Sequence, residues 1–276
     1  MAITAADVNK LRKQTGAGMM DCKKALVETD GDFEAAVDVL RKKGQKVAAK
    51  RGENETKEGL VFAETTNGGK TGVVLALSCE TDFVAKNSDF QDFVKSILDV
   101  ALNNLPDSTD SLMSLPYNDK LSVEEKITEQ IGVIGEKLVV SGYEKIDADC
   151  VVGYNHPGNQ LATLVGLNSG SEVASDAGKQ VAMQVAAMNP IALNKDGIDQ
   201  ATIDRELEVG KELAIQEGKP AEMAEKIAMG RLNKFFKENT LLSQQFVRDN
   251  KQTVEQFLNT TENGLTVSEF KRFSLS

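Results

Sequence analysis

A β-hairpin is predicted by the sequence of residues 60–79, LVFAETTNGGKTGVVLALSC. Its two arms, Leu60 to Thr66 and Thr71 to Cys79, are rich in β-branched and apolar residues. The four residues between them, Asn67-Gly68-Gly69-Lys70, favour a turn. A helix is expected to begin near Ser88. Its buried face would consist of apolar residues at helical spacing, namely Phe90, Phe93, Val94, Ile97, Leu98 and Ala101.

The same order of elements recurs further along the chain. The expected elements are strands at residues 138–146, 150–154 and 161–167 and a helix from residue 171. Residues 105–117 are expected to form a loop, and Ser122 to Glu125 a capping box that begins another helix. A hairpin followed by a helix therefore occurs twice, near residues 59–104 and 149–188. This predicts an α+β fold with a two-part core of small antiparallel sheets backed by helices.

The N-terminal part of the chain predicts three short helices, interrupted at residues 16–18 and 30–32. Up to Arg51 it contains eleven Lys and Arg residues against seven Asp and Glu, a net charge of +4, whereas the whole chain carries −10. The basic run that begins at Arg41 favours a solvated face near the end of the third helix over a phosphate-binding patch. Residues 52–59 are polar and predict a linker.

From Pro190 onward the sequence predicts two longer helices, at residues 198–216 and 221–237. The short break between them, Gly218-Lys219-Pro220, requires an antiparallel arrangement. Such a helical hairpin cannot cover its own apolar seam, so it is expected to meet a partner or another copy of the chain. The expected division is residues 1–52, 53–140, 141–189 together with 238–276, and the inserted hairpin 190–237.

The composition argues against several functions. A net charge of −10 and a pI near 4.9 disfavour direct binding to nucleic acid, which needs a basic surface. The sequence contains no run of about 18 apolar residues, so no membrane span is predicted. Met1 to Thr4 lack the features of a secretory signal. Three separated cysteines and the single histidine, His156, give no disulfide, zinc or two-imidazole site. We therefore expect thiols in a reducing cytoplasm and neither a metal nor a cofactor, and only Cys/His or Asp/Glu chemistry remains open to the chain.

Two motifs that resemble catalytic ones have simpler interpretations. Gly68-Gly69-Lys70-Thr71 joins strand to strand, and Glu64 stands where a phosphate-binding loop requires glycine, so a hairpin turn is favoured. Cys150 and His156 could supply a nucleophile and a base, but Cys150 lies in an apolar run, where a thiol usually serves packing. An enzyme that uses Cys150 is a distant alternative.

Two segments are expected to contact another protein. Met19 and Met20 open a helix after a glycine-rich turn, and both cannot face a small core, so at least one is expected to be exposed. Thr81-Asp82-Phe83-Val84 follows the predicted hairpin and is expected to form a loop that presents an aromatic ring and a carboxylate to a partner's pocket. The competing interpretation buries Phe83 in the core and makes Asp82 a helix-capping acid.

These segments resemble the signatures of a known family. Residues 15–26, TGAGMMDCKKAL, are similar to the N-terminal signature of the bacterial elongation factor Ts family, and residues 81–86, TDFVAK, to its second signature. The likeness covers essentially the whole chain and includes further short stretches, which are Tyr154-Asn155-His156, Gly218-Lys219-Pro220, Ala224-Glu225-Lys226 and Gly230-Arg231.

The resemblance implies a guanine-nucleotide exchange factor for elongation factor Tu, which binds the GDP-bound partner, disturbs its magnesium and phosphate site and promotes GDP release. It also implies an N-terminal module like a ubiquitin-associated domain and a helical-hairpin (coiled-coil) insertion used in dimer contacts. Neither covalent catalysis nor a direct contact with nucleic acid or membrane is implied.

The resemblance also implies which residues contact the partner. Thr81, Asp82, Phe83 and Val84 would approach the magnesium site, with Asp82 and Phe83 entering the partner's G domain. The secondary contacts would be Arg12, Met19, Met20, Lys23 and His156. The alternative from another class is a non-catalytic adaptor that binds partners through the small helical module and the helical hairpin. An adaptor would leave the nucleotide release rate of its partner unchanged.

Overall fold

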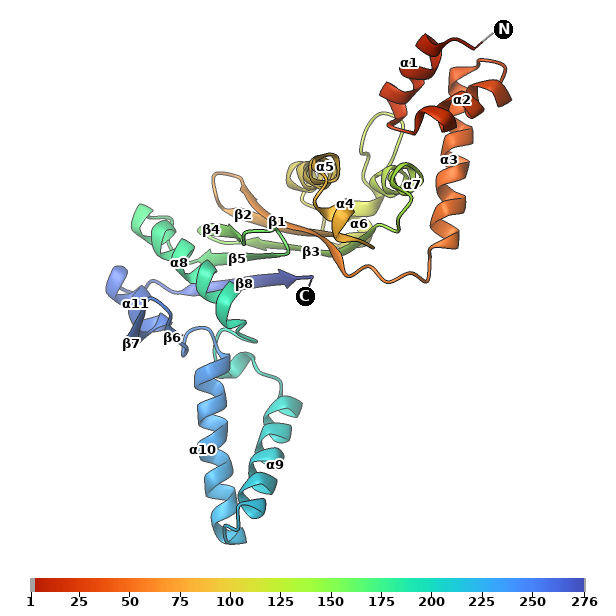
Figure 1. Ribbon diagram of the computed structural model, residues 1–276. Helices are drawn as coiled ribbons and strands as arrows, with labels where there is room; N and C mark the ends of the chain where they lie inside the picture. Colours follow the sequence, from red (N-terminus) through yellow and green to blue (C-terminus); the bar gives the residue numbers. More distant parts are fainter. Residues whose placement is uncertain (1–2, 276) are drawn as a thin grey trace.

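Two three-stranded antiparallel sheets form the centre of the molecule (Figure 1). The computed structural model describes residues 3–275, so Met1, Ala2 and Ser276, at the ends of the predicted terminal segments, lie outside the described residues. The first sheet has the order β1-β2-β3, with β1 at Glu58–Thr66, β2 at Thr71–Cys79 and β3 at Val139–Asp147. The second has the order β4-β5-β8, with β4 at Cys150–Asn155, β5 at Leu161–Leu167 and β8 at Val267–Ser274.

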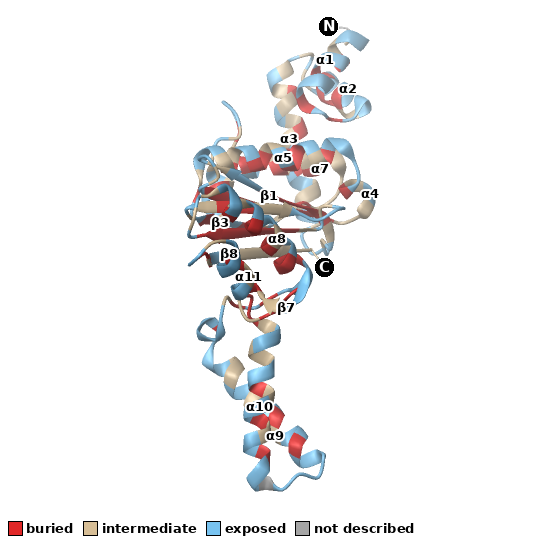
Figure 2. Cartoon of the chain, turned by 90° about the vertical axis from the view of Figure 1, so that its left-hand side faces the viewer, coloured by how far each residue is buried: buried red, intermediate tan, exposed pale blue. Residues whose placement is uncertain are grey.

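The two sheets pack face to face between two layers of helices. Alternate residues of β1 point to opposite faces, so Leu60 and Phe62 pack with the helices α5 (Ser88–Asn104) and α7 (Val123–Ile134). Val61 and Ala63 face the second sheet. The outer face of the second sheet is covered by α8 (Glu172–Met188) and α11 (Val254–Thr261). Figure 2 shows the buried residues concentrated in these layers, which confirms the α+β class.

Several local elements differ from the sequence prediction. β3 pairs with β2, so the first sheet extends to Asp147 and passes the expected boundary at residue 140. The predicted loop 105–117 contains the helix α6 (Thr109–Ser114). The Ser108 side chain caps this helix, and Leu112 anchors it because its side chain is fully buried. The segment expected to be a loop after β2 forms a short helix, α4 (Asp82–Ala85). Two further short strands, β6 (Gln245–Phe246) and β7 (Asp249–Thr253), were not predicted.

Three helices at the N-terminus pack around a small core of their own. They are α1 (Ala5–Thr15), α2 (Met19–Glu28) and α3 (Phe33–Lys50), which we call the N-terminal helical module. Thr4 and Asp7 form the capping box that begins α1. The core of the module consists of Val8, Leu11, Ala17, Cys22, Ala25, Leu26, Ala36 and Leu40.

The second half of α3 leaves this core and crosses α7 at two glycines. A Cβ atom on Gly44 would lie 2.6 Å from the carbonyl oxygen of Thr128, and one on Gly132 would lie 2.7 Å from the Cα of Gly44. The two backbones are therefore closer than any larger residue allows. This crossing attaches the N-terminal helical module to the first half of the core.

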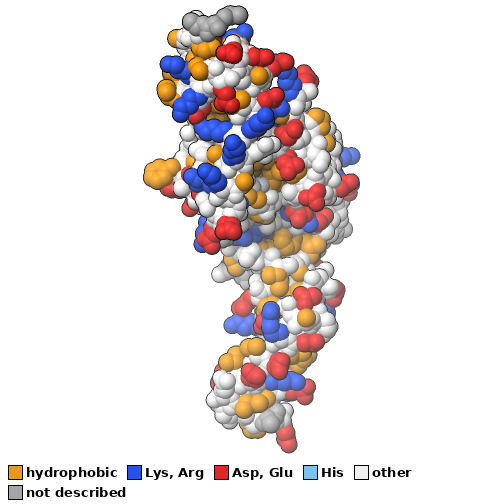
Figure 3. All heavy atoms as spheres, turned by 90° about the vertical axis from the view of Figure 1, so that its right-hand side faces the viewer, with side chains coloured by type: hydrophobic (Ala, Val, Ile, Leu, Met, Phe, Trp, Pro, Cys, Tyr) orange, Lys and Arg blue, Asp and Glu red, His pale blue; other side chains and the backbone are white. Residues whose placement is uncertain are grey.

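Two further helices, α9 (Gln200–Gln216) and α10 (Ala221–Asn239), lie side by side and project away from the sheets (Figure 1). The short 3-10 helix η1 (Lys195–Gly197) precedes them. Ala214, Ala224, Ala228 and Leu232 are buried, and Gly210 lies against Ala228 at the contact between the two helices. Figure 3 shows hydrophobic, acidic and basic side chains interspersed on the outer surface of this projecting pair.

A Gly→Ala substitution is expected to change the free energy of unfolding in opposite directions at the glycine crossing and at an open position in another helix. Gly132→Ala forces α3 and α7 apart and is expected to lower the free energy of unfolding by about 1–3 kcal/mol. Gly230→Ala, in α10, meets nothing within 4 Å and is expected to raise it by roughly 0.5–1 kcal/mol, because alanine favours helix. Urea unfolding measures both. Hydrogen exchange is expected to speed up in α1–α3 in the first variant only. Unchanged stability of Gly132→Ala would contradict the close crossing.

Candidate functional site

The end of β2 presents the side chain of Phe83 to solvent. β2 is buried at every position up to Cys79, and after Glu80 and Thr81 the chain forms α4. Ala85 is buried and Val84 packs against the core of the first half, so the inner side of α4 is anchored. Phe83 is 83% exposed, more than any other large hydrophobic side chain in residues 3–275. It has no place in the core, and the competing interpretation is wrong on this point.

Asp82 lies beside Phe83 as the first residue of α4. Its carboxylate accepts a hydrogen bond from the Nζ of Lys86 at 2.6 Å. This hydrogen bond lowers the pKa of Asp82, so the carboxylate is ionised at neutral pH. The N-cap position of α4 belongs to Thr81 and not to Asp82, and the Thr81 hydroxyl does not cap the helix because it binds Glu136.

Glu136 binds the two residues that precede α4, Glu80 and Thr81, through its carboxylate. It follows Gly135, which ends α7 with a left-handed φ of 81°. Its carboxylate accepts the backbone N–H groups of Glu80 and Thr81, both at 3.1 Å, and the hydroxyl of Thr81 at 2.7 Å. Sequence analysis missed Glu136. A single charged residue after a helix-ending glycine is typical of a solvated surface, and no local pattern distinguishes it.

The turn that contains His156 is attached to the first sheet close to α4. The Asn155 side chain accepts from the N–H of Ala63 at 2.7 Å and donates to its carbonyl at 3.0 Å. His156 is exposed, and its Nδ1 lies 3.0 Å from the Tyr154 hydroxyl. A cavity of about 520 Å³ is lined both by α4 and by this turn, with Asp82, Ala85, Lys86, Gly158, Asn159 and Gln160 among its residues. The structure thus brings residues 81–84 and the turn after His156 to one surface.

The remaining predicted contact residues lie on the N-terminal helical module, away from α4 (Figures 1 and 2). Arg12 lies in the last turn of α1, and Lys23 lies on α2; both are exposed. Met19 and Met20 are 55% and 64% exposed, so both methionines face solvent. A single partner that touched these residues and Phe83 would have to cover an extended surface, as a folded protein can.

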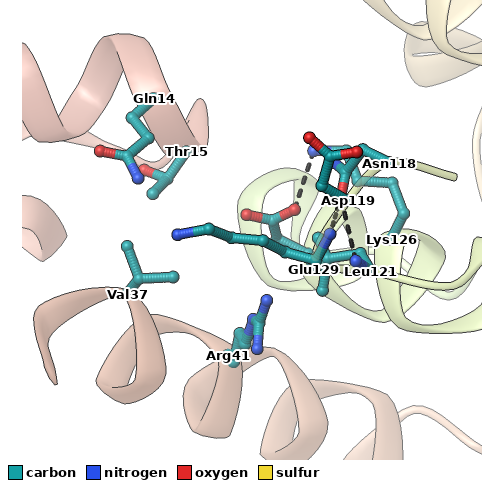
Figure 4. A pocket seen from close by; sticks show the side chains of 10 residues that line it. Gln14, Thr15, Val37, Arg41, Asn118, Asp119, Leu121, Lys126 and Glu129 are labelled. Carbon is teal, nitrogen blue, oxygen red and sulfur yellow. Dashed lines mark hydrogen bonds and ion pairs between the residues drawn. The ribbon is translucent and has the colours of Figure 1, made fainter. Parts of the chain in front are cut away.

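A second cavity, of about 280 Å³, lies at the seam between the N-terminal helical module and α7 (Figure 4). Its lining includes Arg41 together with Lys126 and Glu129, which form an ion pair at 2.8 Å. Lys120, also in the lining, lies 3.7 Å from Glu34. The lining thus carries charges of both signs, with Asp119 and Glu129 facing the three basic residues.

The nucleophilic side chains are arranged for packing. Cys150 and Asn155 stand at opposite ends of β4, about 16 Å apart at 3.3 Å per residue, so Cys150 cannot form a hydrogen-bonded pair with His156. Burial raises the pKa of Cys22, and it raises that of Cys79 to about 12. Within residues 3–275 no three His, Cys, Asp or Glu side chains are grouped as metal ligands. No described helix is long and apolar enough to cross a membrane.

An exposed aromatic side chain on an anchored helix and two exposed methionines on another module are typical of the surface of a protein-binding protein. Comparisons with known proteins give the family. The family described as "Elongation factor TS" matches residues 80–276. The chain is 52% identical over 275 residues to elongation factor Ts of Cytophaga hutchinsonii, covering 99% of both chains. It is 50% identical to that of Christiangramia forsetii and 53% identical to that of Amoebophilus asiaticus, covering 99% of this chain and 98% of each relative.

The chain belongs to the elongation factor Ts family. Its role is that of a guanine-nucleotide exchange factor for elongation factor Tu in protein biosynthesis, which confirms the prediction from the sequence. The adaptor alternative is not favoured.

The burial of the thiols predicts an order of chemical modification. Cys150 is partly exposed, whereas Cys22 and Cys79 are buried, and a pKa of about 12 leaves only about one Cys79 in ten thousand ionised at pH 8. N-ethylmaleimide is therefore expected to modify Cys150 first and to reach Cys22 and Cys79 only after urea is added. Peptide mass spectrometry measures the order. Modification of Cys79 as fast as Cys150 in the native protein would contradict it.

Proposed function

We propose that the chain binds GDP-bound elongation factor Tu and releases GDP by inserting Phe83, with Asp82 beside it, next to the partner's magnesium and phosphate site. The exposure of Phe83 on an anchored helix is the observation that carries this proposal. Thr81 and Val84 flank the inserted residues and fix their direction, since Val84 packs into the core. The chain itself forms and breaks no covalent bond.

Release follows from linkage between the two binding events. When a protein binds the nucleotide-free partner more tightly than the nucleotide-bound partner, the ratio of these two affinities is also the ratio by which it weakens the partner's affinity for nucleotide. Each tenfold loss of nucleotide affinity requires about 1.4 kcal/mol of difference in interface energy. One buried aromatic anchor can supply this amount. Magnesium demands nearly ideal octahedral oxygen geometry, so a small displacement of the segments around it is sufficient to loosen the metal and then the phosphates.

The secondary contacts extend the same interface. Arg12, Met19, Met20 and Lys23 are proposed to hold a helix of the partner's G domain through the N-terminal helical module, which resembles a ubiquitin-associated domain. His156 is proposed to contact the partner from the second half of the core. The exposure of all five residues supports these assignments.

The other proposed properties concern assembly and location. The insertion 190–237 is proposed to act as a coiled-coil hairpin that joins two copies of the chain, supported by exposed apolar residues on α9 and α10 such as Val209, Leu213 and Met229. The acidic net charge of −10 supports a factor that works without touching nucleic acid. Three cysteines without disulfide or zinc spacing support a place in the reducing cytoplasm. No contact with a membrane is proposed.

Phe83→Ala is expected to reduce the acceleration of GDP release at least about tenfold, because the ring supplies the differential interface energy. Stopped-flow fluorescence of a labelled GDP analogue, bound to elongation factor Tu from the same cell, measures the rate with increasing amounts of this chain. Val173→Ala is the matched control, since it also shortens an exposed apolar side chain, 52% exposed, but on α8. Full acceleration by Phe83→Ala would contradict the insertion mechanism, and no acceleration by the unmodified chain would favour the adaptor.

A further inference from the structure

Residues 80–81 and 136–137 bind each other reciprocally. The Glu136 carboxylate accepts the N–H groups of Glu80 and Thr81. In the opposite direction, the Glu80 carboxylate accepts the backbone N–H of Lys137 at 2.6 Å. We call these four residues, together with Arg51, the polar clamp. Each carboxylate therefore fixes the backbone that carries the other.

The linker that follows the N-terminal helical module closes the polar clamp from outside. Arg51 directly follows Lys50, the last residue of α3. One of its guanidinium nitrogens donates to both carboxylate oxygens of Glu80, at 2.9 and 2.8 Å. Lys137 Nζ donates to the carbonyl oxygens of Gly52 and Asn54 at 2.6 and 2.9 Å. Although desolvation opposes it, hydrogen bonds from Lys137, Asn54 and Arg51 lower the pKa of Glu80, so this carboxylate is charged at neutral pH.

α4 depends on the polar clamp for its direction. It has only four residues and no hydrogen bond from a capping side chain, and so short a helix is unstable by itself. The Thr81 hydroxyl, which would ordinarily cap it, binds Glu136 at 2.7 Å. The buried Ala85 and the partly buried Val84 limit how far α4 can move, while Glu136 fixes the backbone of the two residues that precede it.

α7 connects this clamp to the N-terminal helical module. Gly132, in the last turn of α7, is in close contact with Gly44 of α3, and Gly135 and Glu136 follow directly after the last residue of α7, Ile134. One helix thus carries the N-terminal helical module at its side and the support of residues 81–84 at its end.

We propose that Glu136 is a positioning residue for nucleotide exchange, which holds Phe83 in its inserting orientation and at a fixed spacing from the N-terminal helical module. This rests on the proposed insertion of Phe83. Without Glu136, α4 must be ordered during docking, and misplacement by about 1 Å is known to reduce rates as much as 100-fold. The other contacts with the partner remain. Removal of Glu136 is therefore expected to lower the GDP release rate at a saturating concentration of this chain. It is expected to change the half-saturating concentration much less.

The test compares Glu136→Ala with Glu136→Gln in the full chain, by stopped-flow GDP release from elongation factor Tu. The alanine variant is expected to lower the saturating rate about tenfold and to change the half-saturating concentration less than about threefold. Glutamine can keep all three contacts, since its carbonyl accepts both N–H groups and its amide donates to the Thr81 hydroxyl. It is therefore expected to retain the rate within about threefold. Glu124→Ala, which removes an exposed carboxylate from the start of α7, is the control and is expected to change nothing.

The outcomes separate this inference from the function on which it rests. If Phe83→Ala abolishes the acceleration and Glu136→Ala does not reduce it, the positioning role is overturned and the insertion of Phe83 stands. If Phe83→Ala accelerates release fully, the proposed insertion itself fails. A folded Glu136→Gln as slow as Glu136→Ala would also overturn positioning by these hydrogen bonds. Should Glu136→Ala not fold, Thr81→Val removes one contact of the polar clamp, and an unchanged saturating rate in that variant would overturn the inference.

Discussion

The burial of β2 on both faces is the constraint on which the rest of the structure depends. Every residue from Thr71 to Cys79 is buried, between helices on one side and the second sheet on the other. Buried apolar area stabilises the fold by roughly 25 cal/mol per Å², so the end of this strand is fixed in space. Only Glu80 and Thr81 separate it from α4. The position of Phe83 is therefore inherited from the core.

An exposed phenylalanine contributes little to folding. Burying such a side chain is worth about 1.5–3 kcal/mol relative to exposure, and for Phe83 this free energy is realised only when a partner covers the ring. The fold supports the exposure by anchoring the neighbouring residues. Ala85 is buried, and the Cys79 thiol, whose pKa of about 12 keeps it protonated, donates to the Thr81 carbonyl at 3.2 Å. A rigid base beneath a free aromatic ring suits insertion into a preformed slot.

Local signals in the sequence predicted the elements whose causes are local. The Asn67 to Lys70 turn, the capping box at Ser122 and the apolar face of α5 lie where they were expected. The pairing of β3 with β2 was missed, because a strand's own pattern does not say which sheet it joins. Glu136 was missed for the same reason, since its partners are more than fifty residues away in the chain.

The connection through α7 changes how two separate contacts can act together. If the N-terminal helical module hung on a flexible linker, its contact would only raise the effective concentration of Phe83 near the partner. The glycine crossing and the polar clamp instead join both surfaces to one helix. Movement of the module relative to residues 81–84 then requires breaking packed or hydrogen-bonded contacts. On the proposed contacts, binding free energy gathered at Met19 and Met20 would be available to drive the insertion of Phe83, and remote contacts would contribute to the release rate as well as to affinity.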